Sequence, residues 1–149
     1  MAIRLKTRDE IERMRAAGRV VRQVHERVRE ICRPGITTRE IDEEGARVIE
    51  QSGGQGLFKN YPTYRPGEGF PANLCISVND EVVHGIAGER VIQDGDAVGI
   101  DCGVKLDGWC GDAATTILVG HVQPEVRRLC EVTEHVLNLA VENIRPGRK

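Results

Sequence analysis

Apolar residues near the start of the chain recur at steps of three and four, the spacing of one buried face of an α-helix. Thr7 and Glu10 precede this run with the spacing of a capping box, which predicts where the helix begins. Pro34 and Gly35 predict where it ends. The predicted buried stripe consists of Ile11, Met14, Ala17, Val20, Val21, Val24, Val28 and Ile31.

The same signals predict two further helices. Thr37 and Glu40 form a second capping box, and Gly53 with Gly54 ends the helix that follows. Pro124 suits the first turn of a third helix. The buried side of the second helix is marked by Ile41, Val48 and Ile49, and that of the third by Val126, Leu129, Val132, Thr133, Val136, Ala140 and Asn143.

Residues 53–72 are rich in glycine, proline and aromatic residues and predict a loop. This segment holds Phe58, Tyr61, Tyr64 and Phe70, which with one tryptophan are all the aromatic residues of the chain. The composition favours a loop pinned to the core by its rings. The wall of an apolar pocket is the alternative interpretation.

Two β-hairpins are predicted after this loop. The first pairs residues 74–78 with 81–86 across Asn79-Asp80, which would place Cys75 opposite His84. The second pairs residues 97–104 with 109–119 around Asp107-Gly108, a strong signal for a two-residue turn. Together with the helices, these hairpins predict an α+β fold: a curved, mainly antiparallel sheet with helices on one face.

Composition narrows the class of protein. A chain of 149 residues with 40% hydrophobic and 30% charged residues suits a single globular domain, here residues 1–149. The net charge of −2 gives no electrostatic case for nucleic acid or membrane as the main partner. No apolar run suits a membrane span or a secretory signal, so we expect a cytoplasmic protein. The cysteine number is odd and no CxxC pair occurs, which favours reduced thiols over a cysteine-based zinc site.

The second predicted hairpin carries the candidate chemistry. In its first strand Val98, Ile100, Cys102 and Val104 point to one face and Asp101 points to the other. The turn then sets Gly103 opposite Asp112 and Asp101 opposite Ala114. Asp101 and Asp112 become diagonal neighbours on one face, with Cα atoms ~7–8 Å apart.

Two carboxylates this close repel unless a cation lies between them. Gly103 and Ala114 are small and leave room for an ion, and oxygen ligands suit Mn²⁺, Mg²⁺ or Ca²⁺. Imidazoles from elsewhere would widen the choice to Fe²⁺, Co²⁺ or Zn²⁺. The spacing of the two aspartates is not specific by itself, and two solvated side chains on an open hairpin face explain it equally well.

His84 is a second candidate site residue. A lone histidine in a strand is more often a hydrogen-bonded structural residue than a functional one. Here it follows the aromatic loop and shares a predicted face with Cys75, so it could line a small apolar pocket and offer a hydrogen bond to a substrate.

Two long motifs carry a resemblance to a known family. FPANLCISVNDEVVHGI (residues 70–86) and DGDAVGIDCGVKLDGWCGDAATT (residues 94–116) strongly resemble type I methionine aminopeptidases, of peptidase family M24. The likeness covers nearly the whole chain. It implies half of a pita-bread (creatinase/aminopeptidase-like) fold, with residues 1–149 as the N-terminal half of the catalytic domain and the second half absent from this chain.

The resemblance also implies roles for individual residues. Asp101 matches the first metal-binding aspartate of the family, and Asp112 matches the aspartate that bridges both metals. His84 matches the histidine that contacts the substrate and assists cleavage of the peptide bond. Phe70 and Cys75 match positions that line the pocket for the methionine side chain. The segment 59–69 is longer than the family pattern, which leaves Tyr61 and Tyr64 without an assigned role.

The implied activity is metal-dependent removal of the initiator methionine from nascent polypeptides. The implied cofactors are two divalent ions, which activate a water and polarise the scissile carbonyl. The sequence does not distinguish Co, Mn, Fe, Zn and Ni. The family also uses one histidine and two glutamates that this chain does not contain. We therefore expect weak or partial metal occupancy and negligible turnover by this chain alone.

The implied partners follow from this activity. They are the N-terminal methionine of nascent peptides and, as a further candidate, the ribosome. The full enzyme is expected to be a monomer, whereas an isolated half could associate with a second copy through its open sheet edge. A non-catalytic protein-binding module related to the pita-bread fold is the alternative function. The presence of Asp101, Asp112 and His84 weighs against that alternative.

Overall fold

The computed structural model describes residues 4–63 and 67–148. The described residues form three helices: α1 (Arg8–Ile31), α2 (Thr38–Gln51) and α3 (Pro124–Asn143). Both predicted capping boxes form at the starts of α1 and α2, each with a threonine side chain that accepts from the backbone of the third helical residue. The proline at the start of α3 is confirmed in its first-turn position.

The strands form one antiparallel sheet with a long strand at its centre. The strands are β1 (Gln55–Gly56), β2 (Cys75–Val78), β3 (Ala97–Leu106) and β4 (Trp109–Leu118). One edge of β3 pairs along its whole length with β4, while β2 and β1 pair with successive parts of the other edge. The predicted hairpin around residues 107 and 108 is confirmed, and both turn residues have positive φ, as a type I′ turn requires.

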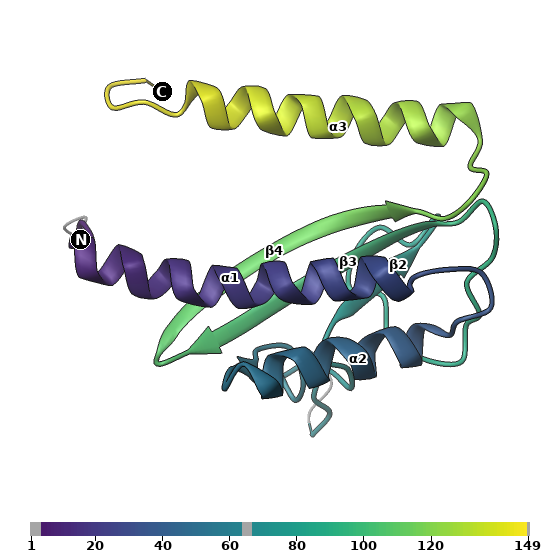
Figure 1. Ribbon diagram of the computed structural model, residues 1–149, viewed down its shortest axis with the longest axis horizontal. Helices are drawn as coiled ribbons and strands as arrows, with labels where there is room; N and C mark the ends of the chain where they lie inside the picture. Colours follow the sequence, from purple (N-terminus) through teal and green to yellow (C-terminus); the bar gives the residue numbers. More distant parts are fainter. Residues whose placement is uncertain (1–3, 64–66, 149) are drawn as a thin grey trace.

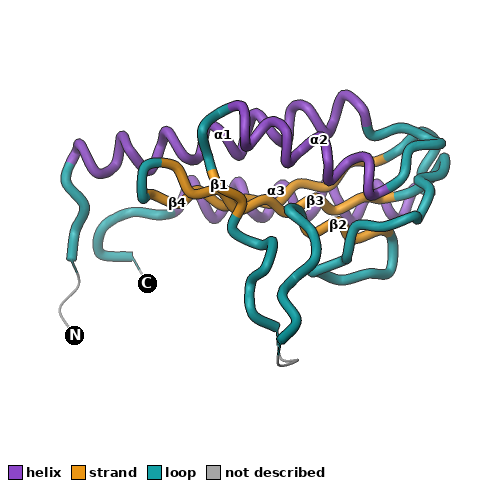
Figure 2. Tube along the Cα trace, turned by 90° about the horizontal axis from the view of Figure 1, so that it is seen from below, coloured by secondary structure: helices purple, strands orange, loops and turns teal. Residues whose placement is uncertain are grey.

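Helices α1 and α2 cover one face of this sheet (Figures 1 and 2), as the predicted α+β fold requires. The apolar residues of β3 face these helices: Val98, Ile100, Cys102 and Val104 are all fully buried. Every second residue of β3 and β4 therefore points to the opposite face of the sheet. A single core between helices and sheet thus leaves the other face available for a site.

The predicted pairing of the first hairpin is wrong. β2 pairs with β3, and only an isolated bridge joins Cys75 to Ile86, so His84 does not lie opposite Cys75. Asn79 has a positive φ, and its side chain bonds Asp96 and the backbone of Ala97 at the start of β3. Residues 81–86 do not form a strand, because the backbone at His84 leaves the extended region with a φ of 59°.

α3 differs from the other helices because none of its residues is buried. Its predicted stripe is present but exposed, since Leu129 keeps 67% and Val136 57% of its accessible surface. Figure 1 shows α3 following β4 and running back along the length of the molecule. Among the described residues, no strand pairs with the outer edge of β4. Across residues 4–63 and 67–148, no helix combines the length and the hydrophobicity that a membrane span requires.

Candidate metal centre

Asp101 on β3 and Asp112 on β4 lie on the sheet face opposite the helices. The predicted register is confirmed: Gly103 pairs with Asp112, and Asp101 pairs with Ala114. Gly111, next to Asp112, faces α1 so closely that an added Cβ would lie 2.6 Å from the backbone nitrogen of Gly18. Asp112 therefore points away from α1, to the same face as Asp101.

Gly103 forms the floor between the two carboxylates. A Cβ atom at this position would lie 2.9 Å from Oδ2 of Asp112 and 2.8 Å from Cε1 of Phe58. The carboxylate of Asp112 thus extends over Gly103 of β3, and the Phe58 ring closes another side of the same space. Any larger residue at position 103 would fill this cradle.

The electrostatics of the cradle favour a bound cation. Oδ1 of Asp101 is buried without a hydrogen-bond partner in the described structure. Burial raises the pKa of the Asp101 carboxyl, the charge of Asp112 raises it further, and the Cys102 backbone and His84 act in the opposite direction. A divalent cation would satisfy the unpartnered oxygen and remove the repulsion between the carboxylates, so these residues fit a metal ion.

Cys75 and Phe70 were predicted to line a pocket beside this centre. Cys75 pairs directly with Asp101 across β2 and β3, so both side chains lie on the same sheet face. Cys75 is 6% exposed, and burial raises the pKa of its thiol to about 11, with the charges of Asp101, Asp112 and Asp42 adding to the shift. Phe70 is half-buried, and its backbone bonds Asn60 and Tyr61 at the base of the aromatic loop. Tyr64 lies outside the described residues.

Phe58 is the residue of this site that the sequence analysis did not single out. It was one of several aromatic residues in the predicted loop, and no local pattern distinguished it from the others. Its contact with Gly103 joins positions far apart in the sequence, which only the fold brings together.

His84 lies beside the centre rather than inside it. The side chain is exposed, its φ is 59°, and its positive charge when protonated lowers the pKa of Asp101. The next residue, Gly85, is tied to β2 by a bond from its N–H to Ser77 and a bond to its carbonyl from the Ile76 N–H. The main chain after His84 is therefore fixed, and the imidazole remains free to contact a ligand.

The two carboxylates do not complete a metal site within the described part of the chain. Residues 4–63 and 67–148 contain no cluster of three or more His, Cys, Asp or Glu side chains arranged to hold a metal ion. Further ligands would have to come from water, substrate or other polypeptide.

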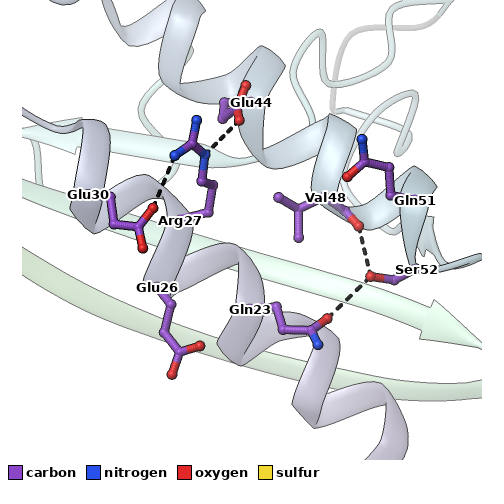
Figure 3. Close-up of a pocket in the computed structure, with 8 residues that line it drawn as sticks. All are labelled: Gln23, Glu26, Arg27, Glu30, Glu44, Val48, Gln51 and Ser52. Atoms are coloured by element: carbon purple, nitrogen blue, oxygen red, sulfur yellow. Dashed lines mark hydrogen bonds and ion pairs between the residues drawn. The ribbon is translucent and has the colours of Figure 1, made fainter.

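A separate polar groove of about 390 Å³ lies between α1 and α2 (Figure 3), on the helical layer rather than at the carboxylates. Arg27 bonds Glu30 and Glu44 there, and Ser52 bonds Gln23 and the Val48 carbonyl. Because the guanidinium is already paired with two carboxylates, this groove presents no uncompensated positive charge.

His25 on α1 packs close to the strand that carries Asp112. Burial lowers its pKa, the charge of Arg29 lowers it further, and the backbone of Ala113 acts against this. Its Nε2 is buried without a partner among the described residues, so protonation would place an unsatisfied N–H there. The folded chain therefore favours the neutral ring.

This environment predicts a pH dependence of stability. The pKa of His25 is lower in the folded chain than its ordinary value of 6.5, which applies to the unfolded chain. As pH falls below 6.5, the unfolded chain therefore binds the proton more readily, and the free energy of unfolding decreases. The decrease in the free energy of unfolding should stay under about 1 kcal/mol, because the ring is partly solvated. Urea unfolding from pH 7.5 to 5.5 should show this decline in the unmodified chain and a smaller decline in His25→Gln. His135→Gln, on exposed α3, should retain the full decline, and equal profiles for all three proteins would contradict the assignment.

The antiparallel sheet, its two covering helices and the paired carboxylates are compatible with a metallopeptidase. Residues 12–149 match the sequence model of metallopeptidase family M24, and the chain belongs to this family. It is 42% identical over 144 residues to methionine aminopeptidase 1 of Bacillus subtilis, covering 97% of this chain and 56% of that protein. The methionine aminopeptidase of Aquifex aeolicus is 40% identical, covering 100% of this chain and 58% of that protein.

Solved structures agree with these relatives. The methionine aminopeptidase of Rickettsia prowazekii matches with a TM-score of 0.91 and 32% identity, covering 99% of this chain and 57% of that one. That of Thermotoga maritima matches with a TM-score of 0.90 and 35% identity, covering 98% and 57%. The pita-bread fold expectation is thus confirmed. The chain spans about half the length of the curated relatives that it matches.

Proposed function

We propose that this chain is the N-terminal half of a methionine aminopeptidase and supplies two carboxylates of its metal centre, Asp101 and Asp112. One observation carries the proposal: on a chain 42% identical to such an enzyme, these carboxylates share one sheet face, and one buried oxygen lacks a partner. The activity is metal-dependent release of N-terminal methionine from nascent polypeptides.

The chain's own residues would hold divalent metal through the oxygens of Asp101 and Asp112 above the floor formed by Gly103. Manganese, cobalt, iron, zinc and nickel all remain candidates, and two ions are proposed for the complete site. Bound metal would supply Lewis acidity at the scissile carbonyl and an activated water. The Phe58 ring would limit access of bulk water to one side of the cradle, because its edge lies against the Gly103 backbone.

The substrate side of the proposal rests on the surroundings of Asp101. Cys75 offers a small apolar wall directly beside this carboxylate, and Phe70 is placed at the base of the neighbouring loop. These residues would contact the methionine side chain mainly through burial of apolar surface. His84 would donate a hydrogen bond to the substrate peptide, because its ring is exposed while the next residue is anchored to β2.

The partners and location remain proposals. We infer nascent polypeptides in the cytoplasm as the substrates, with the ribosome as a further candidate partner. The exposed apolar residues of α3 support the expectation that the isolated chain associates with a second copy. Negligible turnover by this chain alone also stays a prediction.

Calorimetric titration with Mn²⁺ tests the proposal. The chain should bind weakly, with a dissociation constant on the order of 10⁻⁴–10⁻³ M, because two carboxylates leave most of the coordination shell to water. Asp101→Asn and Asp112→Asn should each weaken binding at least about tenfold. Asp107→Asn is the matched control, because it removes one carboxylate from the turn of the same hairpin. If all three variants bind equally well, the two aspartates do not form the metal centre.

A further inference from the structure

A buried carboxylate on the helical side of the sheet has no part in the site described above. Asp42 on α2 is 7% exposed. Its oxygens accept three hydrogen bonds, from the Asn73 backbone N–H at 2.8 Å, the Asn73 side-chain amide at 2.9 Å and the Leu74 N–H at 2.7 Å. All three donors belong to the two residues immediately before β2. One side chain of α2 thus determines where that strand begins.

Packing reinforces this connection. A Cβ atom at Gly45, one helical turn after Asp42, would lie 2.5 Å from Cδ1 of Leu74. Leu74 is fully buried, so α2 rests directly on this side chain. The carboxylate and the leucine together hold residues 73 and 74 against α2 by both hydrogen bonds and apolar contact.

The consequence falls on Cys75, the first residue of β2 and the strand partner of Asp101. β2 is only four residues long, so few backbone hydrogen bonds to β3 set its register. A shift by one residue would turn Cys75 to the opposite face of the sheet. The bonds from residues 73 and 74 to Asp42 favour the observed register at the start of β2, as the bonds of Asn79 do at its other end.

We propose that Asp42 is a positioning residue that fixes the register of β2 and thereby holds Cys75 beside Asp101. Its relevance to a substrate pocket rests on the proposed function. Asp42 itself bonds to the segment before β2, on the side of the sheet that α2 covers, and it acts on the position of Cys75 through the strand. Its charge also adds to the rise in the pKa of the Cys75 thiol, so charge and position have to be tested separately.

Residue-resolved alkylation of the cysteines in the native, metal-free chain tests this role. Cys110 is exposed and should react fast, whereas Cys75 and the fully buried Cys102 should react slowly. Asp42→Asn keeps the side-chain shape but replaces an acceptor by a donor, so at least one of the three bonds is lost. We expect the Cys75 rate to rise about tenfold and the Cys102 rate to stay unchanged, because only the start of β2 is released.

Two further variants separate positioning from other effects. Asp42→Glu keeps the charge but displaces it by one methylene, and it should also increase the Cys75 rate. If Asp42→Glu has no effect, the change in Asp42→Asn is electrostatic and the proposal fails. Ile41→Val destabilises the same helix without removing a hydrogen bond to Asp42. It should change the alkylation rates of Cys75 and Cys102 in parallel. The same parallel rise in Asp42→Asn, or an unchanged Cys75 rate, would also overturn the proposal.

The assay is independent of the metal centre. If the manganese titration fails while Cys75 responds selectively, the proposed function is wrong and the positioning role stands. If manganese binds as expected while Cys75 does not respond, only the positioning role is wrong.

Discussion

Gly111→Ala should destabilise the chain by about 1–3 kcal/mol or more, whereas Gly18→Ala should stabilise it by about 0.5–1 kcal/mol. The two glycines lie against each other where α1 crosses β4. A Cβ at position 111 would approach the Gly18 nitrogen to 2.6 Å and the Ala17 carbonyl carbon to 2.8 Å, both of them backbone atoms. Because helix backbone cannot rotate aside as a side chain can, α1 would have to move away from the sheet.

Gly18 is the matched control because its added methyl group meets no atom within 4 Å. Alanine also has the higher helix propensity, so this substitution favours the folded state. Urea unfolding followed by circular dichroism should show the two midpoints moving in opposite directions. A stable Gly111→Ala protein would mean that α1 does not approach β4 as closely as the structure shows. Since Asp112 follows Gly111, loss of this contact should also weaken Mn²⁺ binding.

Asp101→Asn should have opposite effects on stability without and with metal. In the metal-free chain, burial and the charge of Asp112 raise the pKa of Asp101, so its ionised form costs stability at neutral pH. A carboxyl with a raised folded pKa loses stability as pH rises from its unfolded value through its folded value. Asparagine removes this charge, and the metal-free variant should unfold at a higher temperature than the unmodified chain at pH 7.

Added Mn²⁺ should reverse this order. At millimolar Mn²⁺ the unmodified chain gains stability by mass action, whereas the Asp101→Asn variant gains little. Thermal unfolding at pH 7 with and without Mn²⁺ measures both effects, and Asp107→Asn again serves as the control of equal charge. A metal-free Asp101→Asn protein less stable than the unmodified chain would show that this carboxylate makes a favourable contact in the fold. The two carboxylates would then not be arranged to share a cation.

The helices and the second hairpin could be predicted because their signals are local. Thr7 with Glu10 and Thr37 with Glu40 satisfy helix-end groups within one turn, and Asp107-Gly108 adopts the positive φ values of its turn type. The Asp107-Gly108 turn also sets the register that brings Asp101 and Asp112 to one face of the sheet. The centre of the candidate site could therefore be predicted from a segment of fewer than twenty residues.

The first hairpin could not be predicted because its decisive contacts are distant in the sequence. Asn79 forms a turn, but its side chain bonds residues at the start of β3, and β2 pairs there rather than with the segment after the turn. The predicted position of His84 also failed, because its backbone has a positive φ and is not extended as a strand requires. A propensity for turn or strand contains no information on which strand will be the partner.

The chain's own sequence determined where its helices and its long hairpin lie and which two carboxylates share a face, because capping, periodicity and turn geometry act over a few residues. The remaining features depend on contacts that form only in the folded chain. The tertiary structure placed Phe58 on Gly103, anchored the start of β2 to Asp42, and left α3 without a buried residue. Each of these outcomes depends on packing between segments remote in sequence, where shape and burial rather than local propensity set the free energy.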